Sequence, residues 1–213
     1  MQQISIYLPG IILAYSAFLL AIASPGPNIL ALIGTSMGVG RSSGVALALG
    51  VATGSFLWAM LTVIGLSALL STYAFALYAI KIFGGLYLLW LGYKSFKSAA
   101  LKHDIEGVEL SGGRRSLFGY AKRGFIIQMT NPKAALAWIA IISLGLQHDA
   151  PMWVGIVIVL GTFIMSIIVH VLYAVAFSTS AMVRIYSKAR RYIQASLGAF
   201  FTFVGIKLLV SRD

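Results

Sequence analysis

The stretch IASPGPNIL, residues 22–30, places two prolines and a glycine inside an apolar run that carries no charged residue from Met1 to Gly40. Proline lacks the backbone N–H of a helical residue and clashes with the preceding turn, so an unbroken helix is not expected here. Ser24 is a favoured N-cap, and Pro25 then falls at the first helical position, where a missing N–H costs nothing. The stretch therefore predicts an apolar span broken into two half-helices, with Ser24 as the cap of the second.

The composition indicates a membrane protein. The chain has 213 residues, of which 60% are hydrophobic and only 10% are charged. Residues 42–80 and 152–183 are two further stretches without any charged residue. Each uncharged stretch exceeds the roughly 20 residues that a helix needs to cross a bilayer. We expect an all-α integral membrane protein that forms a single transmembrane domain over residues 1–213.

Hydropathy predicts six transmembrane helices, at about 8–36, 43–69, 75–96, 119–146, 152–178 and 191–210. Most of the charge behind the net +11 lies in a loop of about 97–118 with its flanks and in the segment Arg184–Arg191. The positive-inside rule makes these basic segments cytoplasmic and puts both termini outside. The same distribution argues against a nucleic-acid partner, because no finger motif and no stripe of aromatic and basic residues accompanies it.

Several chemistries are excluded by what the sequence lacks. There is no cysteine, and therefore no disulfide, thiolate nucleophile or Cys-based metal site. The three histidines are scattered, and every acidic residue falls in a predicted loop or in the tail: Asp104, Glu106, Glu109, Asp149 and Asp213. Because no nucleophile–base set and no metal constellation emerges, we expect neither an enzyme nor a cofactor or metal site.

The two halves of the chain resemble each other. The segment KIFGGLYLLWLGYK (81–94) in the third span aligns without gaps to QASLGAFFTFVGIK (194–207) in the sixth. The alignment pairs three identical residues: Gly85 with Gly198, Gly92 with Gly205 and Lys94 with Lys207. The two repeats would be about 8–96 and 119–210. Because each contains three spans, an odd number, the second repeat starts on the opposite side of the membrane and must be inverted. Inverted repeats recur in secondary transporters, whose substrates bind at broken helices near the membrane midplane.

The stretch QMTNPKAAL, residues 128–136, supplies the second repeat with a matching break. Asn131 is the expected N-cap there, and Pro132 is the first helical residue. The two new helix N-termini would offer partial positive charge and amide groups to a carboxylate, and carbonyl groups before each break could accept an ammonium group. The paired breaks therefore predict a site for a free amino acid. The alternative is that both prolines only kink their helices and shape the packing.

The predicted substrate-binding residues belong to the two breaks: Ser24, Pro25, Gly26, Pro27, Asn28, Gln128, Asn131, Pro132 and Lys133. Lys133 falls well inside a span, where an ionisable residue is expensive and its default interpretation is functional. It could neutralise a carboxylate or exchange a proton, or it could extend to the interface. His170 could relay protons or simply form a hydrogen bond to a neighbouring helix. Because no span carries an acidic residue, we expect a zwitterion with a neutral side chain rather than a basic amino acid.

Three motifs together resemble the LysE/RhtB family of amino-acid exporters: Ser24-Pro25-Gly26-Pro27-Asn28, Gly38-Val39-Gly40-Arg41 and Thr130-Asn131-Pro132-Lys133-Ala134. The similarity in length, span count and motif order covers nearly the whole chain. The resemblance implies a multi-pass protein of the bacterial inner membrane that expels amino acids or their derivatives, driven by the proton-motive force. Because its predicted spans carry no carboxylate, the chain resembles the homoserine/threonine-type branch of the family more than the lysine/arginine-type branch.

Taken together, these patterns predict a secondary active exporter of small, neutral amino acids that works by alternating access with proton antiport. The expected partners are the amino-acid substrate, protons and the lipid bilayer. The sequence leaves open whether the protein acts as a homo-oligomer. It also leaves open export of basic amino acids or other small metabolites, and a non-transporting membrane scaffold.

Overall fold

The structure is a computed structural model that describes residues 2–24, 26–72, 74–100, 115–145 and 150–210. Across these residues all regular secondary structure is helical. The helices are α1 (Gln2–Ala23), α2 (Pro27–Gly38), α3 (Arg41–Thr72), α4 (Ala74–Ala100), α5 (Leu117–Met129), α6 (Pro132–Gly145), α7 (Met152–Ala176) and α8 (Ser180–Val210). The expected all-α class is confirmed.

Both proline motifs interrupt helices, as the sequence predicts. The first separates α1 from α2, and the second separates α5 from α6, whose axes differ by 65°. Several helix ends differ from those expected, most of all because α8 already begins at Ser180, α1 begins at Gln2 and α4 continues to Ala100. The basic residues Arg184–Arg191, expected in a loop, therefore lie in a helix. Hydropathy detects only the apolar part of a helix. Lys and Arg are good helix formers although they are polar, so a helix can continue through a basic segment.

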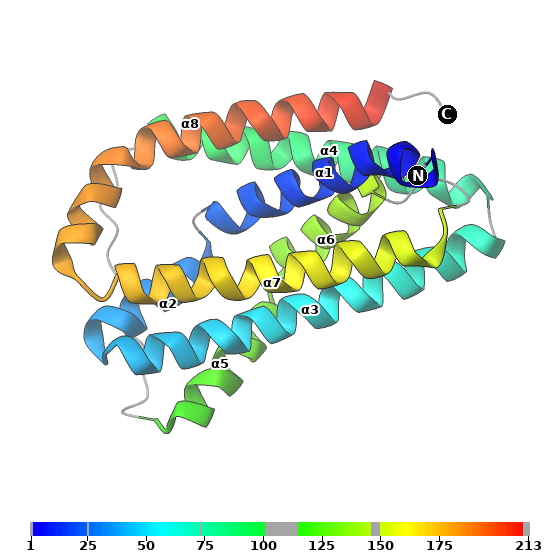
Figure 1. The fold of residues 1–213 in the computed structure, drawn as a ribbon. Helices are drawn as coiled ribbons and strands as arrows, with labels where there is room; N and C mark the ends of the chain where they lie inside the picture. Colours follow the sequence, from blue (N-terminus) through cyan, green and yellow to red (C-terminus); the bar gives the residue numbers. More distant parts are fainter. Residues whose placement is uncertain (1, 25, 73, 101–114, 146–149, 211–213) are drawn as a thin grey trace.

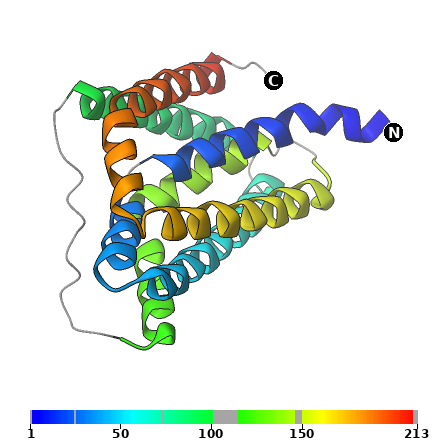
Figure 2. The ribbon, with the colours of Figure 1, turned by 60° about the vertical axis from the view of Figure 1, so that its left-hand side comes forward.

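The helices form one bundle whose two ends differ. Figure 1 shows the start of α1 and the end of α8 at the same end of the bundle, where α3 also ends and α7 begins. The opposite end carries the α2–α3 and α7–α8 connections. In Figures 1 and 2, α4 and α8 run side by side, and α3 packs against both α5 and α7.

Several helices are long and apolar enough to cross a bilayer. Within the part of the chain that the structure describes, they are Ser5–Ala23, Arg41–Gly65, Met152–Ala176 and Ser180–Val210, and the bent pair α5–α6 would be a fifth if it acts as one span. The expected count of six spans and the inverted repeat both stay predictions.

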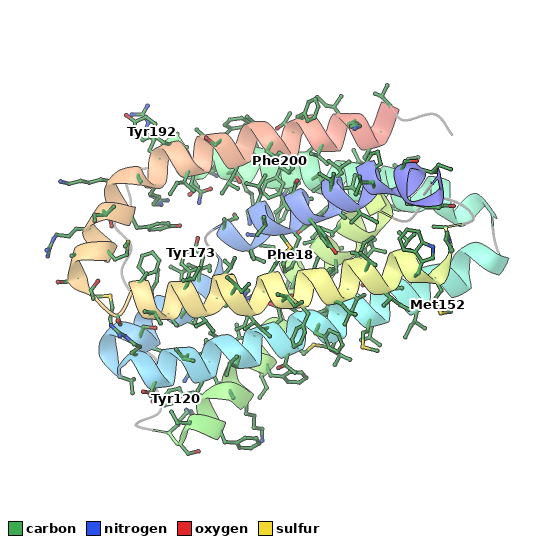
Figure 3. The ribbon with its side chains drawn as sticks, viewed as in Figure 1. Phe18, Tyr120, Met152, Tyr173, Tyr192 and Phe200 are labelled. Carbon is green, nitrogen blue, oxygen red and sulfur yellow. The ribbon has the colours of Figure 1, made fainter. Side chains whose placement is uncertain are left out.

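The surface of the bundle is apolar and its interior is partly polar, which is typical of a membrane protein. Phe83 on α4 is 72% exposed and Phe203 on α8 is 64% exposed, whereas Ser166 and His170 on α7 are buried. Figure 3 likewise shows Met152 pointing away from the bundle. Exposed apolar surface of this extent would cause aggregation in water but is well solvated by lipid. The chain is thus a membrane protein.

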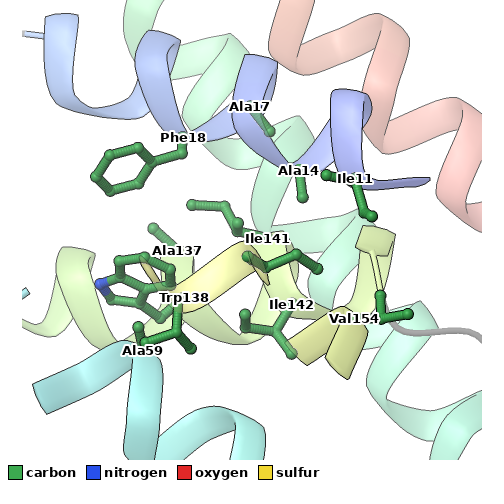
Figure 4. Packing of buried hydrophobic residues seen from close by; sticks show 12 residues of the cluster. Ile11, Ala14, Ala17, Phe18, Ala59, Ala137, Trp138, Ile141, Ile142 and Val154 are labelled. Carbon is green, nitrogen blue, oxygen red and sulfur yellow. The ribbon is translucent and has the colours of Figure 1, made fainter. Parts of the chain in front are cut away.

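A core cluster from α1, α3, α6 and α7 lies directly beside the helix breaks. Phe18 of α1 and Trp138 of α6 pack with ring centroids 5.1 Å apart, and Ala59 of α3 is buried in the same cluster. Figure 4 shows these side chains converging from separate helices. The cluster packs α1, which precedes the first break, against α6, which follows the second break.

Glycines allow two helix pairs to approach closely. At Gly50 of α3 a Cβ atom would overlap the carbonyl of Ala121 in α5, and at Gly124 of α5 it would overlap the carbonyl of Leu47 in α3. Close backbone contact of this kind is how membrane helices associate. The α3–α5 pair is therefore fixed in register immediately before the second break.

The α4–α8 pair makes two related glycine contacts. A Cβ atom at Gly85 would lie 3.2 Å from the carbonyl oxygen of Gly205, and one at Gly205 would lie 3.0 Å from that of Gly85. A Cβ atom at Gly92 would lie 3.2 Å from the carbonyl oxygen of Gly198. The sequence alignment of the two halves pairs Gly85 with Gly198 and Gly92 with Gly205. It therefore maps each of these two contacts onto the other.

Candidate functional site

The first break starts α2 two residues later than the sequence predicts. α1 ends at Ala23, and Gly26 is extended, with φ −160° and ψ −176°, so that Pro27 is the first residue of α2. Ser24 is therefore not the N-cap; that position belongs to Gly26, which has no side chain to cap the helix. The reason is the second proline, because a residue that precedes proline is driven out of the helical region. Pro25 lies outside the described residues.

The start of α2 leaves amide groups available for a ligand. The first helical hydrogen bond runs from the amide of Leu30 to the carbonyl of Gly26, at 3.0 Å. Pro27 has no N–H, and the amides of Asn28 and Ile29 have no acceptor within the helix because they lie in its first turn. No side-chain cap compensates at this N-terminus, which is an electrostatically favourable place for an anion.

The second break matches the sequence prediction. Pro132 is the first residue of α6, and the Asn131 side chain accepts a hydrogen bond of 3.0 Å from the amide of Lys133. This confirms Asn131 as the cap. Before the break, the amide of Thr130 still donates to Ile126, so α5 is intact to its last turn.

The two breaks meet in space. Lys133 donates a hydrogen bond of 3.1 Å from Nζ to the hydroxyl of Ser24, and its Nζ atom lies 3.5 Å from where a Cβ of Gly26 would be. On the other side of the breaks, the side-chain nitrogen Nδ2 of Asn28 donates a hydrogen bond to the side-chain oxygen Oε1 of Gln128. Residues from the two halves of the chain thus bind each other directly at the breaks.

A cavity of about 60 Å³ lies between these contacts. Seven of the predicted site residues line it: Ser24, Gly26, Asn28, Gln128, Asn131, Lys133 and His170. The remaining wall comes from α3 and from the aromatic cluster, including Ser55, Phe18 and Trp138. Pro27 and Pro132 do not line this cavity but line a larger one beside it. The volume is several times the ~10–15 Å³ that one water molecule requires.

The polar groups around the cavity are unequally satisfied. The side-chain oxygen of Asn28 is buried and has no hydrogen-bond partner. Lys133 has a neutral hydroxyl as its contact, and all five acidic residues lie outside the described residues. The cavity therefore contains one cation and one unpartnered acceptor, and no carboxylate among the described residues that line it.

His170 is fixed by its own helix. It is 2% exposed, and Nδ1 lies 2.8 Å from the carbonyl oxygen of Ser166. Because a carbonyl only accepts, Nδ1 carries the proton in this contact, and Nε2 is the ring nitrogen left to exchange protons. Among the described residues, the hydrogen-bond contacts of His170 are with Ser166 of the same helix, α7, and the proton-relay role stays a prediction.

Two aromatic residues contribute in ways that the sequence did not indicate. The indole nitrogen of Trp58 on α3 donates to the backbone carbonyl of Gln128 at 3.3 Å, which supports the chain just before the second break. The hydroxyl of Tyr87 on α4 donates to the carbonyl of Lys133 at 2.9 Å. Both residues fall in aromatic-rich apolar spans, where the pattern predicts packing or an interfacial belt, so no sequence signal distinguishes them.

Comparison with known proteins agrees with this architecture. The sequence profile described as LysE type translocator matches residues 19–212. The chain belongs to the LysE family. The earlier resemblance is thereby confirmed over nearly the full length, and a family of translocators is consistent with a protein that is not an enzyme.

Characterised relatives of this LysE-family protein are named as efflux proteins. The threonine efflux protein of Escherichia coli (strain K12) is 28% identical over 202 residues, which are 91% of this chain and 94% of that protein. The homoserine/homoserine lactone efflux protein of Salmonella typhimurium is 26% identical over 190 residues, 89% and 90% of the two chains. The leucine efflux protein of an Enterobacter strain is 33% identical over 116 residues, 54% of each. No solved structure matches the LysE-family chain.

Proposed function

We propose that the protein is a secondary active exporter of small amino acids with neutral side chains. The observation that carries the proposal is the cavity at the two breaks, where the ammonium group of Lys133 and the unpartnered oxygen of Asn28 line the same space. A free amino acid has one carboxylate and one ammonium group, and this cavity offers a partner of the right kind for each. The relatives named for efflux of threonine, leucine and homoserine support the same class of substrate.

In this proposal the carboxylate binds to Lys133 and to the amides at the start of α2. An anion at a helix N-terminus interacts favourably with both the amides and the helix dipole. The α-ammonium group donates to the side-chain oxygen of Asn28, whose nitrogen is held by Gln128. The lining residues include no carboxylate for a second cationic group, so a neutral substrate side chain fits better than a basic one.

The transport mechanism we propose is alternating access between two inverted repeats. Its support is the α4–α8 interface, where Gly85 contacts Gly205 and Gly92 contacts Gly198. Replacing each glycine by its counterpart in the repeat alignment turns the first contact into the second. An interface related to itself in this way is what a two-fold axis in the membrane plane would produce. The break residues lie between the repeats, where rocking of one repeat against the other would expose the cavity to either side.

For orientation, we propose the bacterial inner membrane with the basic end of the bundle in the cytoplasm. Arg41 and the Arg184–Arg191 segment both lie at the end opposite to the termini. The positive-inside rule then puts both termini outside. Proton antiport is proposed through Lys133 and His170, because the half-buried Lys133 and the buried His170 are both ionisable groups on the cavity wall.

The test is counterflow of radiolabelled amino acids in proteoliposomes that contain the purified full chain, followed by efflux from cells loaded with dipeptides. We expect saturable exchange of threonine-like amino acids and a loss of uphill efflux when an uncoupler is added. No exchange across a broad amino-acid panel would contradict the proposal and favour a scaffold. Flux that neither saturates nor responds to a pH gradient would indicate a passive channel.

A further inference from the structure

A second, larger cavity adjoins the substrate cavity. Its volume is about 460 Å³, within the ~300–1,000 Å³ that is usual for small-molecule sites. It shares four wall residues with the substrate cavity: Ser24, Gly26, Asn131 and Lys133. The hydrogen bond between Lys133 and Ser24 thus belongs to the walls of both cavities.

The larger cavity leads from the breaks toward the basic end of the bundle. Along α4 its wall runs from Tyr87, which contacts the backbone of Lys133, through Lys94 to Ser98, close to the end of that helix. From α8 it includes Gln194, which lies near the middle of that helix. In the orientation proposed above, the Ser98 side of this cavity faces the cytoplasm and the Lys133 side faces the breaks.

A cation and neutral hydrogen-bonding groups line this path. Lys94 is exposed, and its Nζ atom lies 4.3 Å from the centroid of the Trp90 ring, a cation–π contact that holds the ammonium group at the cavity wall. Ser95 and Gln194, which are 5% and 3% exposed, contribute neutral polar groups to the same wall. Lys97, one turn further along α4, is also exposed but does not line the cavity.

We propose that the cavity lined by Lys94 and Trp90 is a cytoplasmic docking subsite for the carboxylate of the amino-acid substrate, which then passes to Lys133. The inference rests on the proposed function and names a second binding site for the same substrate. Lys94 binds the carboxylate as an exposed and partly screened charge, whereas Lys133 binds it as a half-buried charge. Its role therefore exceeds the topological one that a basic residue near a span end would otherwise have.

The experiment measures amino-acid uptake into everted membrane vesicles, where the cytoplasmic face is outside, for the wild type and for Lys94→Gln, Lys94→Arg and Lys97→Gln. We expect Lys94→Gln to raise KM about three- to fivefold with little change in Vmax, the range for loss of one solvated charge pair. Lys94→Arg keeps the charge and should stay near the wild type. Lys97→Gln removes the same charge from the same helix end and should also leave KM unchanged.

Ionic strength gives a second measurement on the same vesicles. Salt screens an exposed charge, so the KM of the wild type should rise with salt more steeply than that of Lys94→Gln. A wild-type KM and salt dependence in Lys94→Gln, or an equal effect of Lys97→Gln, would overturn the docking subsite while leaving the exporter assignment intact. Absence of any amino-acid uptake by the wild type would instead overturn the proposed function and this inference with it.

Discussion

Lys133 and Ser24 are 109 residues apart in the chain, and the Nζ atom of Lys133 donates a hydrogen bond of 3.1 Å to the Ser24 hydroxyl. Lys133 lies in the first turn of α6 and Ser24 directly follows α1, so this contact joins the two helix breaks. A hydroxyl neutralises no charge. A partly buried cation whose partner among the described residues is neutral is costly to maintain, and such a residue is more consistent with ligand binding than with stability.

We predict that Lys133→Met strongly impairs transport without unfolding the protein. Hydrogen bonds to charged groups contribute about 1.5–3 kcal/mol, so losing the contact with a carboxylate should lower kcat/KM by about tenfold or more. The apparent Tm in detergent should stay the same or rise, because an incompletely paired charge leaves the interior. Efflux assays and thermal unfolding, followed by tryptophan fluorescence, measure the two effects.

Lys122→Met is the matched control for this prediction. Lys122 lies on α5, in the other half of the same broken span, and is exposed. It should transport like the wild type. Wild-type transport by Lys133→Met would contradict the role given to this lysine.

We predict that Asn28→Ala weakens recognition of the substrate's α-ammonium group. The side-chain oxygen of Asn28 is buried and unpartnered, so it is the acceptor that an ammonium group would satisfy. Wild-type transport of an α-amino acid should be inhibited poorly by the matching α-hydroxy acid, which cannot supply the ammonium group. In Asn28→Ala the amino acid should lose affinity by about tenfold, whereas inhibition by the hydroxy acid should change little. Equal losses for both compounds would indicate a general disruption of the site instead.

The local chemistry of the breaks was largely predictable from sequence, with one instructive error. The cap at Asn131 and the helix start at Pro132 follow from residue preferences that act within one turn. The same preferences placed the cap of the first break at Ser24, but the Pro25–Gly26–Pro27 pattern restrains successive residues, and Gly26 is extended before Pro27. A single proline predicts one helix start. Two prolines in close succession offer two possible starts, and here the helix begins at the second.

The long-range contacts of the site could not be predicted from one sequence. The pairing of Lys133 with Ser24 depends on how α1 packs against α6, and the contact of Asn28 with Gln128 spans 100 residues. Sequence patterns report the solvent that each face of a helix meets, not which neighbour it meets. Lys94 illustrates the limit, because its position near a span end indicates topology while its contact with Trp90 is visible only in the fold.

We predict that Gly124→Ala destabilises the protein far more than Gly65→Ala. A Cβ atom at Gly124 would overlap the backbone of Leu47, which cannot move aside without separating α3 from α5. Overpacking of this kind typically costs about 1–3 kcal/mol, so the apparent Tm should fall clearly. Gly65 lies in α3, where no atom of the described residues comes within 4 Å of its Cβ position, and alanine there should be tolerated. Equal Tm values for the two variants would argue against close α3–α5 packing.

We predict that Asn131→Ala costs about 1 kcal/mol of stability and reduces transport, because the cap of α6 positions both the helix N-terminus and Lys133. Asn131→Ser provides the conservative comparison, since serine is an equally good N-cap. It should recover most of the stability, as measured by thermal unfolding in detergent. If serine were as damaging as alanine, the amide of Asn131 would have to act through its contact with the substrate rather than through capping.

Our last prediction concerns proton coupling through His170. Its Nδ1 atom is held by the carbonyl of Ser166, so only Nε2 can take up or release a proton on the cavity wall. Glutamine is neutral and of similar length, so His170→Gln should retain a polar group at this wall while losing the ability to titrate. We expect amino-acid counterflow to persist in His170→Gln, because exchange needs no net proton movement, and uphill efflux driven by an inward proton gradient to be lost.

Thr162→Val is the control for this separation of exchange from coupling. Thr162 is a buried residue of α7, like His170, but its hydroxyl donates to Ile158 in the same helix and it does not line the cavity. It should show the wild-type ratio of gradient-driven efflux to counterflow. If His170→Gln were driven by the gradient as well as the wild type, the proton would have to pass by another group, of which Lys133 is the remaining candidate on the wall. If it lost both activities, His170 would be needed for binding or packing, and the proposed role in coupling would be wrong.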